Sequence, residues 1–426
     1  MGVTAIVGAN WGDEGKGKIT DYLAGRSDFV VRFQGGKNAG HTIINDYGKF
    51  ALHLLPSGVF FQNVTNILAT AMAVDVEAFL NERQELLSRG VPDPRILISE
   101  RAQMVLPYHI LFDEYEEERL ADRKFGSTKS GIAPFYADKY MKIGVQAADL
   151  FDEQRLLGRL STALEPKNVL LEHLYGKPPI DPADLVPVLM KHGEAIRPFL
   201  ADTGAILHEA LKEGKTVLME GQLGALRDPD HGIYPYPTSS STLAGFASVG
   251  AGIAPHAIDT VIAVTKAYSS CVGAGPFVTE IFGDEAEELR RRGGSGGEYG
   301  ATTGRPRRMG WFDTVATRYG CRVQGATEAA LTLLDVLGYR DEIPVCTAYE
   351  IDGGKTDEFP VPARLDQSRP VLETLKGWKS DITAVRTFSD LPREAQAYVR
   401  FIEERIDVPV KWISVGPRRE DMIRMG

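Results

Sequence analysis

Thr4-Ala5-Ile6-Val7 runs directly into Gly8-Ala9-Asn10-Trp11-Gly12-Asp13-Glu14-Gly15-Lys16-Gly17-Lys18, and this stretch decides the fold. The first four residues form a short apolar run that is typical of a buried strand. Four glycines follow within eleven residues, and a helix can begin near Lys18. A strand, a glycine-rich loop and a helix in this order direct backbone N–H groups toward a phosphate at the helix N-terminus. The opening residues therefore predict a nucleotide-binding α/β protein.

The loop departs at two positions from the standard phosphate-loop pattern, GxxxxGK[ST]. Asn10 stands where the first glycine is expected, and Gly17 stands where a hydroxyl residue normally holds magnesium. Asp13 can supply the missing oxygen ligand. Its charge repels phosphate unless a metal ion or a proton-transfer role offsets it, so Asp13 is the first candidate for chemistry. The alternative is a tight glycine turn with solvated charges.

A second glycine-rich turn follows the next apolar run, Phe29 to Phe33. It reads Gln34-Gly35-Gly36-Lys37-Asn38-Ala39-Gly40-His41-Thr42. Ligands of open α/β sheets lie beyond the carboxyl ends of the strands, which is where this turn is expected. His41 is therefore a candidate catalytic residue, although a loop histidine is more often an ordinary surface residue.

The pattern of apolar residues along the chain predicts the α/β fold class. Further runs rich in β-branched residues read as buried strands, at Thr216 to Met219, Val261 to Val264, Ala330 to Val336 and Val410 to Val415. Amphipathic helices are predicted over Val76 to Arg89, with Asp75 as N-cap, and over Pro392 to Arg405. We expect a large, mainly parallel central sheet flanked by helices, with small subdomains, similar to P-loop NTPases. Residues 1–426 are expected to form one domain with a mostly helical insertion at about 100–200.

Composition limits the partners and the compartment. The formal net charge of −10 argues against a nucleic-acid or anionic-membrane binder, which needs a basic surface. Three cysteines without CxxC spacing argue against a disulfide framework or a zinc site. No signal peptide and no apolar run of membrane-spanning length is evident. The expectation is a cytoplasmic protein that binds small molecules.

Ordered motifs over nearly the whole chain resemble the adenylosuccinate synthetase family. Besides the two glycine-rich turns, these motifs are Leu52-His53-Leu54-Leu55-Pro56-Ser57-Gly58, Asp230-His231-Gly232, Tyr234-Pro235-Tyr236, Thr238-Ser239-Ser240, Lys266-Ala267-Tyr268, Val272-Gly273-Ala274-Gly275-Pro276-Phe277, Ala301-Thr302-Thr303-Gly304-Arg305-Pro306-Arg307-Arg308, Leu334-Asp335-Val336-Leu337 and Ser414-Val415-Gly416-Pro417.

The resemblance implies a GTP-dependent ligase of the AMP branch of purine biosynthesis. In this family, a base removes the N1 proton of IMP and the C6 oxygen attacks the γ-phosphate of GTP, which gives 6-phosphoryl-IMP. The amino group of L-aspartate then displaces phosphate, and adenylosuccinate, GDP and phosphate are released. Asp13 matches the base and a magnesium ligand, and His41 matches the donor to the transferred phosphate. A metal-bound carboxylate beside a weakly acidic ring N–H suits this task.

The resemblance also assigns binding residues. The GTP site is expected to comprise Gly12, Glu14, Gly15, Lys16, Gly17, Lys18, Gly40, Thr42, Arg307, Leu333, Asp335, Ser414, Val415 and Gly416. IMP is expected to contact Asp13, Asn38, Ala39, His41, Thr128, Lys142, Leu223, Thr238 and Arg305. Aspartate is expected at Ala301, Thr302, Thr303, Gly304, Arg305, Pro306 and Arg307, and Mg²⁺ at Asp13 and Gly40. Asp335 matches the residue that reads guanine, because one carboxylate can accept from both N1–H and the exocyclic amine.

Several departures from the family pattern concern the purine pocket and the subunit contact. Asn10 replaces a usual glutamine, and Cys271 replaces a customary arginine. Leu223 occupies the position of an amide that contacts the purine edge, and Gln222 is displaced by one residue. Lys142 stands where an arginine reaches the neighbouring subunit's nucleotide, which implies a homodimer. Two readings stay open: neutral drift with IMP as substrate, or a paralogue that acts on another 6-oxopurine or analogue nucleotide.

Two other classes of protein fit the sequence less well. If the chain were a GTP-binding regulatory module without ligase activity, we would expect the base, the histidine or the aspartate loop to be lost. All three are present. A dinucleotide-binding oxidoreductase predicts GxGxxG spacing, which the N-terminal loop lacks.

Overall fold

The structure is a computed structural model that describes residues 2–123, 126–294, 296–300 and 304–425. The central sheet of these residues has ten strands. From one edge to the other they are β21 (Met422–Arg424), β20 (Val410–Ser414), β16 (Glu328–Thr332), β11 (Ile258–Lys266), β1 (Val3–Gly8), β10 (Val217–Glu220), β2 (Phe29–Arg32), β5 (Thr65–Leu68), β7 (Arg95–Ser99) and β9 (Leu200–Ala201).

The strand directions confirm the expected mainly parallel sheet. The β20–β21 pair at one edge is antiparallel, and the other neighbouring strands run parallel. β1 lies near the centre between β10 and β11, and most of its residues are buried. The carboxyl ends of β1, β2, β10, β11, β16 and β20 therefore open onto the same edge. This is the edge at which ligands bind in open α/β sheets.

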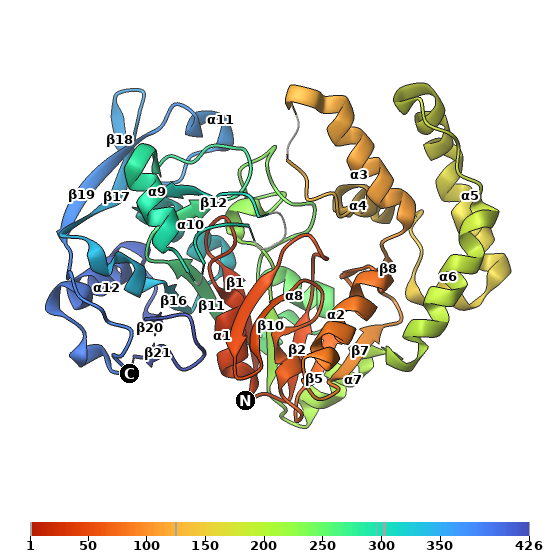
Figure 1. Cartoon of the computed structure of the whole chain (residues 1–426), viewed down its shortest axis with the longest axis horizontal. Coiled ribbons are helices and arrows are strands. Elements are labelled where there is room, and N and C mark those ends of the chain that lie inside the picture. The colour runs from red at the N-terminus through yellow and green to blue at the C-terminus, as the bar shows by residue number, and fades with distance from the viewer. Residues whose placement is uncertain (1, 124–125, 295, 301–303, 426) are drawn as a thin grey trace.

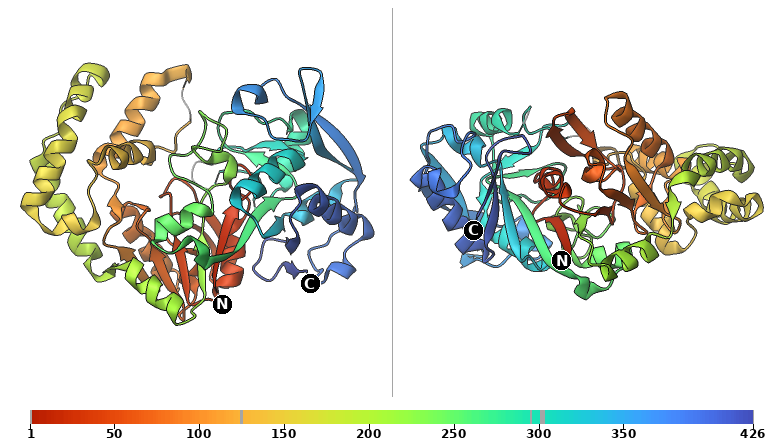
Figure 2. Two further views of the ribbon diagram at one scale, coloured as in Figure 1. Left: turned by 180° about the vertical axis from the view of Figure 1, so that it is seen from behind. Right: turned by 90° about the horizontal axis from the view of Figure 1, so that it is seen from below.

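Helices cover both faces of the sheet (Figures 1 and 2). Ile6 on one face packs with Ile19 of α1 (Lys16–Ala24). Ala5 and Val7 point to the opposite face, in a cluster with residues of α7 (Thr203–Lys212) and α8 (Gly245–Ala251). The alternation follows from the two-residue period of a strand. The remaining core helices are α2 (Val76–Ser88), α9 (Gly283–Arg292), α10 (Thr314–Gln324), α11 (Pro362–Leu365) and α12 (Arg393–Ile406).

Residues from about 100 to 200 are mostly helical, as the sequence predicts. They contain α3 (Pro107–Leu120), α4 (Ile132–Met141), α5 (Glu153–Leu170) and α6 (Pro182–Ile196), which stand together at one side of the sheet (Figure 1). His109 Nε2 lies 2.9 Å from Asp138 Oδ2, and Lys167 also contacts the Asp138 carboxylate. This buried group ties α3, α4 and α5 to one another.

Smaller sheets surround the ligand edge and the C-terminal half. β3 (His41–Asn45) and β4 (Gly48–Leu52) form an antiparallel hairpin that carries His41. The other short sheets pair β6 (Ala73–Val74) with β8 (Gln103–Met104); β12 (Ser269–Cys271) and β13 (Glu280–Ile281) with β14 (Arg308–Gly310); and β15 (Phe312–Asp313), β18 (Gly354–Thr356) and β19 (Arg369–Lys376) with β17 (Glu342–Ile351).

Two local predictions need correction. α1 begins at Lys16 rather than near Lys18, because Gly15, with φ of 91°, serves as its N-cap. The run from Ala330 to Val336 is not one strand: β16 ends at Thr332, and Leu334–Tyr339 form a 3₁₀ helix. Leu333 separates the two elements with a left-handed φ of 58°. Apolar content alone does not reveal such a break.

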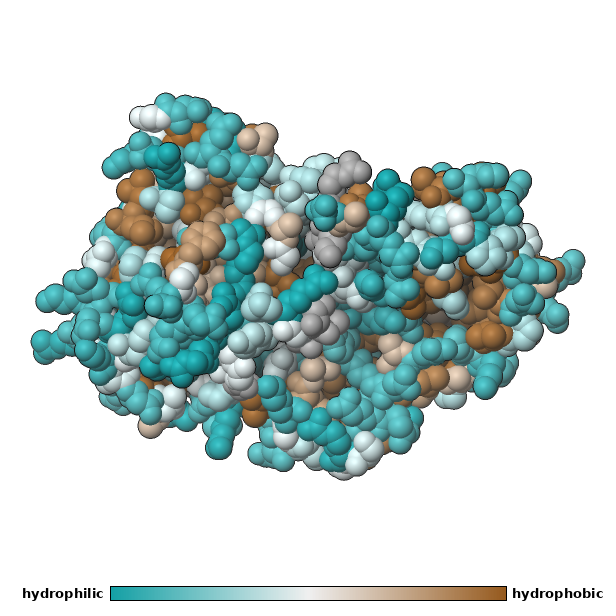
Figure 3. Space-filling model, turned by 45° about the horizontal axis from the view of Figure 1, so that its top comes forward, coloured by the Kyte–Doolittle hydropathy of each residue, from teal (hydrophilic) through white to brown (hydrophobic). Residues whose placement is uncertain are grey.

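The surface seen from above the sheet edge is mainly hydrophilic, with hydrophobic side chains in scattered groups (Figure 3). Among the described residues, no helix combines the length and the apolar character needed to cross a membrane.

Candidate functional site

Side chains of the loop between β1 and α1 stabilise the conformation of that loop. Gly12 and Asp13 have φ values of 99° and 59°, which turn the chain sharply before the helix. Glu14 Oε1 accepts the N–H groups of Asn10 and Gly12 at 3.1 and 2.8 Å, and its Oε2 accepts from Lys16 Nζ at 2.6 Å. The Glu14 carboxylate therefore stabilises the loop from within. Asp13 is the acid of this loop that faces the cavity.

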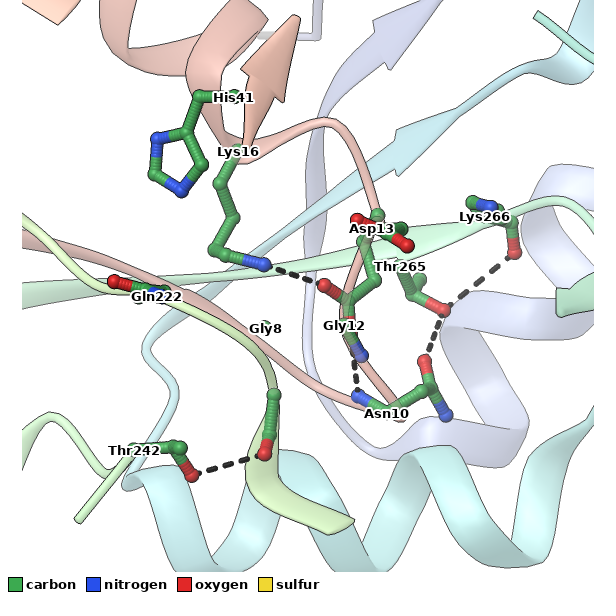
Figure 4. A network of polar contacts seen from close by, with 12 residues as sticks. Gly8, Asn10, Gly12, Asp13, Lys16, His41, Gln222, Thr242, Thr265 and Lys266 are labelled. Carbon is green, nitrogen blue, oxygen red and sulfur yellow. Dashed lines mark hydrogen bonds and ion pairs between the residues drawn. The ribbon is translucent and has the colours of Figure 1, made fainter. Parts of the chain in front are cut away.

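Asn10 fits its unusual position through two buried hydrogen bonds. Its amide Nδ2 donates to Thr317 Oγ1 at 2.9 Å. Its Oδ1 accepts from Thr265 Oγ1 at 2.7 Å, a contact shown in Figure 4. The residue thus links the loop to α10 and β11. Its side chain is committed to the scaffold rather than to a ligand.

A cavity of about 360 Å³ opens where the loops at the sheet edge meet. It collects candidates from widely separated parts of the chain: Asp13, Gly15, Lys16, Gly17, Lys18, Ala39, Gly40, His41, Thr42, Leu223, Arg307, Leu333, Ser414 and Gly416 line it. Within the described residues, the two glycine-rich turns, the arginine loop and the C-terminal loop therefore share one space.

Arg307 crosses the cavity toward Asp13. Its Nε lies 3.1 Å from Asp13 Oδ2, and its Nη1 donates to Glu298 Oε2. The Asp13 side chain is about one quarter exposed, whereas that of Glu298 is almost fully buried. Arg307 thus joins a cavity-facing acid to an anchored one. A guanidinium held in this way suits an incoming carboxylate or phosphate.

Glu298 forms the anchor for the arginine loop. Lys266 Nζ donates to both carboxylate oxygens at 2.9 Å, and Tyr268 Oη donates to Oε1 at 2.5 Å. Burial alone would raise the pKa of Glu298, but Lys266 and Arg307 outweigh burial and hold this pKa at about 2. The carboxylate is therefore ionised at neutral pH and fixes the position of Arg307.

His41 is bound on one ring nitrogen and unpartnered on the other. Nδ1 lies 2.5 Å from Glu220 Oε1, at the carboxyl end of β10. Ser57 holds the same carboxylate through its backbone N–H, 2.8 Å from Oε2, and through its hydroxyl. His41 Nε2 is buried without a hydrogen-bond partner among the described residues. An unpartnered buried nitrogen beside a cavity indicates a ligand contact.

Close approach of α1 and β3 requires glycine at position 17. A Cβ placed on Gly17 would lie 2.8 Å from His41 Cβ, which is too short for two carbon atoms. Gly17, which replaces the hydroxyl residue of the standard phosphate loop, therefore leaves room for the His41 side chain.

The purine-side candidates form a chain of hydrogen bonds. Arg32 Nη2 donates to Gln222 Oε1 at 2.6 Å, and Gln222 Nε2 donates to Asn38 Oδ1 at 2.7 Å. Asn38 Nδ2 in turn lies 3.4 Å from Thr238 Oγ1. Leu223 adopts a left-handed φ of 61°, so the loop bends and the leucine side chain reaches the cavity. Gln222 therefore supports Asn38.

Arg305, Thr128 and Lys142 are not among the residues that line the cavity. Arg305 Nη1 donates to the carbonyl of Gly126 at 3.0 Å, so the arginine loop approaches the segment that carries Thr128. Lys142 is exposed at the C-cap of α4, and Cys271 is buried against Arg227. Ala301, Thr302 and Thr303 lie outside the described residues.

The 3₁₀ helix Leu334–Tyr339, which follows the cavity-lining Leu333, carries Asp335. Asp335 Oδ1 is buried without a hydrogen-bond partner among the described residues. Burial raises the pKa of Asp335 to about 6, and the nearby Lys18 opposes this shift. Ser414 and Gly416 line the cavity close to Leu333, whereas Val415 is buried in the core.

Sequence reasoning missed Glu220 and Glu298 as site residues. Both are buried acids: Glu220 ends a strand, and Glu298 follows a glycine run. Acids that interrupt otherwise buried or glycine-rich segments are the signal that could have identified them.

The family model described as adenylosuccinate synthetase matches residues 5–423 of this chain. The chain belongs to the adenylosuccinate synthetase family. A relative of that name from Streptomyces griseus is 47% identical over 426 residues, which cover 100% of this chain and 99% of the relative. Another, from Mycobacterium tuberculosis, is 46% identical over 425 residues, 99% of this chain and 98% of the relative.

Solved structures agree with the family assignment. The fully ligated adenylosuccinate synthetase of Plasmodium falciparum superposes with a TM-score of 0.91 at 35% identity, with 100% of both chains covered. Succinoaminodeoxyadenylate synthetase of cyanophage S-2L, bound to dGMP and dATP, superposes with a TM-score of 0.59. At 17% identity, over 99% of this chain and 95% of that one, this second likeness shows the fold alone.

Proposed function

We propose that this member of the family ligates L-aspartate to C6 of IMP at the expense of GTP, and releases adenylosuccinate, GDP and phosphate. One observation carries the proposal: the Asp13 carboxylate and the unpartnered His41 Nε2 border the same cavity as the glycine-rich loop. A base, a donor and a phosphate-binding loop are the parts that activation of an oxo group by phosphoryl transfer needs.

Asp13 is the proposed base. It accepts the N1 proton of IMP while the C6 oxygen forms a bond to the γ-phosphorus of GTP and the bond to GDP breaks. The nitrogen of aspartate then forms a bond to C6, phosphate leaves, and the amine loses a proton. Arg307 holds Asp13 in place before the substrates bind and offers its guanidinium to an anionic substrate.

His41 is the proposed donor to the transferred phosphate. Because its Nδ1 faces Glu220, Nε2 donates only when the ring carries a second proton. Burial lowers the pKa of His41, and the Glu220 carboxylate opposes this effect. An arriving phosphate adds negative charge, which favours the protonated ring.

Asp13 and Gly40 fit a magnesium site that is completed by a substrate. Both line the cavity, and Mg²⁺ commonly binds one or two protein oxygens while phosphates and water fill its other positions. We infer that the Asp13 carboxylate and the Gly40 carbonyl hold the ion. When bound, it supplies positive charge that stabilises the transferring phosphoryl group.

The substrates are assigned to three parts of the site. We infer that GTP lies along α1 toward Asp335 and Ser414, and that IMP lies toward Asn38, Thr128 and Thr238. Aspartate lies under the arginine loop. The converging N–H donors of the glycine-rich turns and the paired arginines support this arrangement.

We infer a cytoplasmic homodimer in which Lys142 reaches the neighbouring active site. Tyr140 and Met141, beside Lys142, are 67% and 63% exposed, and two adjacent hydrophobic side chains of this kind can be covered by a partner subunit. The cysteines Cys271, Cys321 and Cys346 are buried and unbonded, which suits a reducing compartment.

The test is an assay of the purified protein with Mg²⁺, GTP and aspartate against IMP, GMP and a purine-analogue monophosphate. We expect product with IMP, and GTP hydrolysis that requires both IMP and aspartate. Hydrolysis that does not depend on aspartate would rule out a ligase. Turnover with GMP in place of IMP would show a paralogue with another 6-oxopurine substrate.

A further inference from the structure

The Lys18 ammonium group is fully occupied by the C-terminal loop. Its Nζ donates to Ser414 Oγ at 2.7 Å, to the Gly416 carbonyl at 2.6 Å and to the Asp421 carbonyl at 3.0 Å. An ammonium group has three N–H bonds, so these acceptors use all of them. Although Lys18 lies in the first turn of α1, directly after the phosphate loop, all three of its donors are therefore directed to the C-terminal loop.

Lys18 also lies within electrostatic reach of Asp335. The charged groups around Lys18 are Asp421, Asp335, Glu420 and Arg386. Those around Asp335 are Lys18, Asp421 and Asp381, so Lys18 is the positive charge among them. Without that charge, the two neighbouring acids and burial would all favour the protonated form of Asp335.

We propose that Lys18 is a positioning residue for recognition of the GTP base: its three hydrogen bonds fix the Ser414–Gly416 loop, and its ammonium group places a positive charge near the Asp335 carboxylate. An ionised carboxylate accepts the two adjacent N–H groups of guanine and repels the N1 lone pair of adenine. The inference rests on the proposed function in one respect, that GTP is the phosphoryl donor. It differs from the usual role of a loop lysine, which binds the phosphates of any nucleoside triphosphate.

A positioning role and a phosphate-binding role for Lys18 predict different losses of kcat/KM in the Lys18→Met variant. We expect kcat/KM for GTP to fall roughly 30-fold, that for ITP to fall less, and that for ATP to change little, so the preference for GTP over ATP drops at least tenfold. The value of kcat at saturating GTP should stay within about threefold of wild type. If Lys18 instead bound the phosphates, Lys18→Met would lose kcat/KM equally with all three nucleotides and would also have a lower kcat. That result would overturn the inference.

The pH dependence of kcat/KM for GTP distinguishes the effect of the Lys18 charge from the effect of its hydrogen bonds. Asp335 with a pKa of about 6 binds guanine when deprotonated, so kcat/KM for GTP should fall as the pH drops through 6. In Lys18→Met this acid limb should move to higher pH, because the neutralising charge is gone. Ser414→Ala removes one acceptor and keeps the charge, so it should weaken GTP binding without moving the limb.

Lys18→Arg provides a second variant should the methionine variant fail to fold. Arginine keeps the charge but cannot reproduce the three converging bonds of an ammonium. We expect a reduced GTP preference with the acid limb in its wild-type position. An unchanged preference in a folded Lys18→Arg protein would contradict the inference. Absence of product in the wild type with any donor would instead refute the proposed function.

Discussion

At the scale of single residues, the buried acids Glu220 and Glu298 orient the side chains of His41 and Arg307. Glu220 fixes one nitrogen of His41 and leaves the other toward the cavity. Glu298 accepts a hydrogen bond from Arg307 Nη1, while Arg307 Nε lies beside the Asp13 carboxylate. Each acid is costly to bury and is satisfied by several donors, so it pre-orients a side chain that lines the cavity.

Glu220→Gln should uncouple His41 from its support. The amide cannot stabilise a protonated ring as a carboxylate does, so we expect kcat to fall roughly 100-fold while the KM values stay within about threefold. Ser57→Ala is the matched control, because it removes a donor to Glu220 and leaves the Glu220–His41 contact. Steady-state kinetics of both variants provide the check. Equal effects of the two substitutions would assign Glu220 a structural role only.

Sequence analysis identifies candidate residues whose neighbours in the chain mark them. Asp13 lies inside a glycine loop, and His41 follows three glycines, so both could be found directly. Glu220 contacts His41 across 179 residues, and Glu298 contacts Lys266 across 32. These pairings depend on how distant loops and strand ends meet in the folded chain, and a single sequence does not specify that arrangement.

At the scale of elements, the site depends on the meeting of α1 with the β3–β4 hairpin. His41 begins β3, and Gly17 lies in the first turn of α1. The sequence predicts the strands β1 and β2 and a helix after the glycine-rich loop, but it does not predict the β3–β4 hairpin. The turn at Leu333 could not be predicted either, because a non-glycine residue in the left-handed region is stabilised by tertiary context.

Gly17→Ser tests this contact, and it also restores the hydroxyl of a standard phosphate loop. The new Cβ would lie 2.8 Å from His41 Cβ, so the histidine must move away from Glu220. We therefore expect kcat to drop roughly 10- to 100-fold despite the added hydroxyl. Gly158→Ala is the control, since nothing lies within 4 Å of its Cβ, and it should behave as wild type. A Gly17→Ser enzyme with full activity would show that His41 does not need its observed position.

At the scale of the whole molecule, the helical region from 100 to 200 brings Lys142 and its exposed neighbours Tyr140 and Met141 to the surface. The sequence predicts the α/β class correctly. It places the site at the carboxyl edge of the sheet, because parallel strands share that edge.

Lys142→Ala tests the proposed subunit contact. If Lys142 binds the partner's nucleotide, KM for IMP should rise roughly tenfold while KM for GTP stays within about threefold. Light scattering after size-exclusion chromatography should show a dimer for the wild type. A monomeric wild-type enzyme at assay concentrations, fully active with IMP, would contradict a shared site.

The central claim is that Asp13 is the base that makes the purine oxygen nucleophilic. Asp13→Asn keeps the size of the side chain and removes its ability to accept the proton. Single-turnover formation of adenylosuccinate from IMP, GTP and aspartate is the most direct measurement. We predict a loss of at least about 1000-fold, with GTP still bound. Product formation by Asp13→Asn at a rate near that of the wild type would contradict the account.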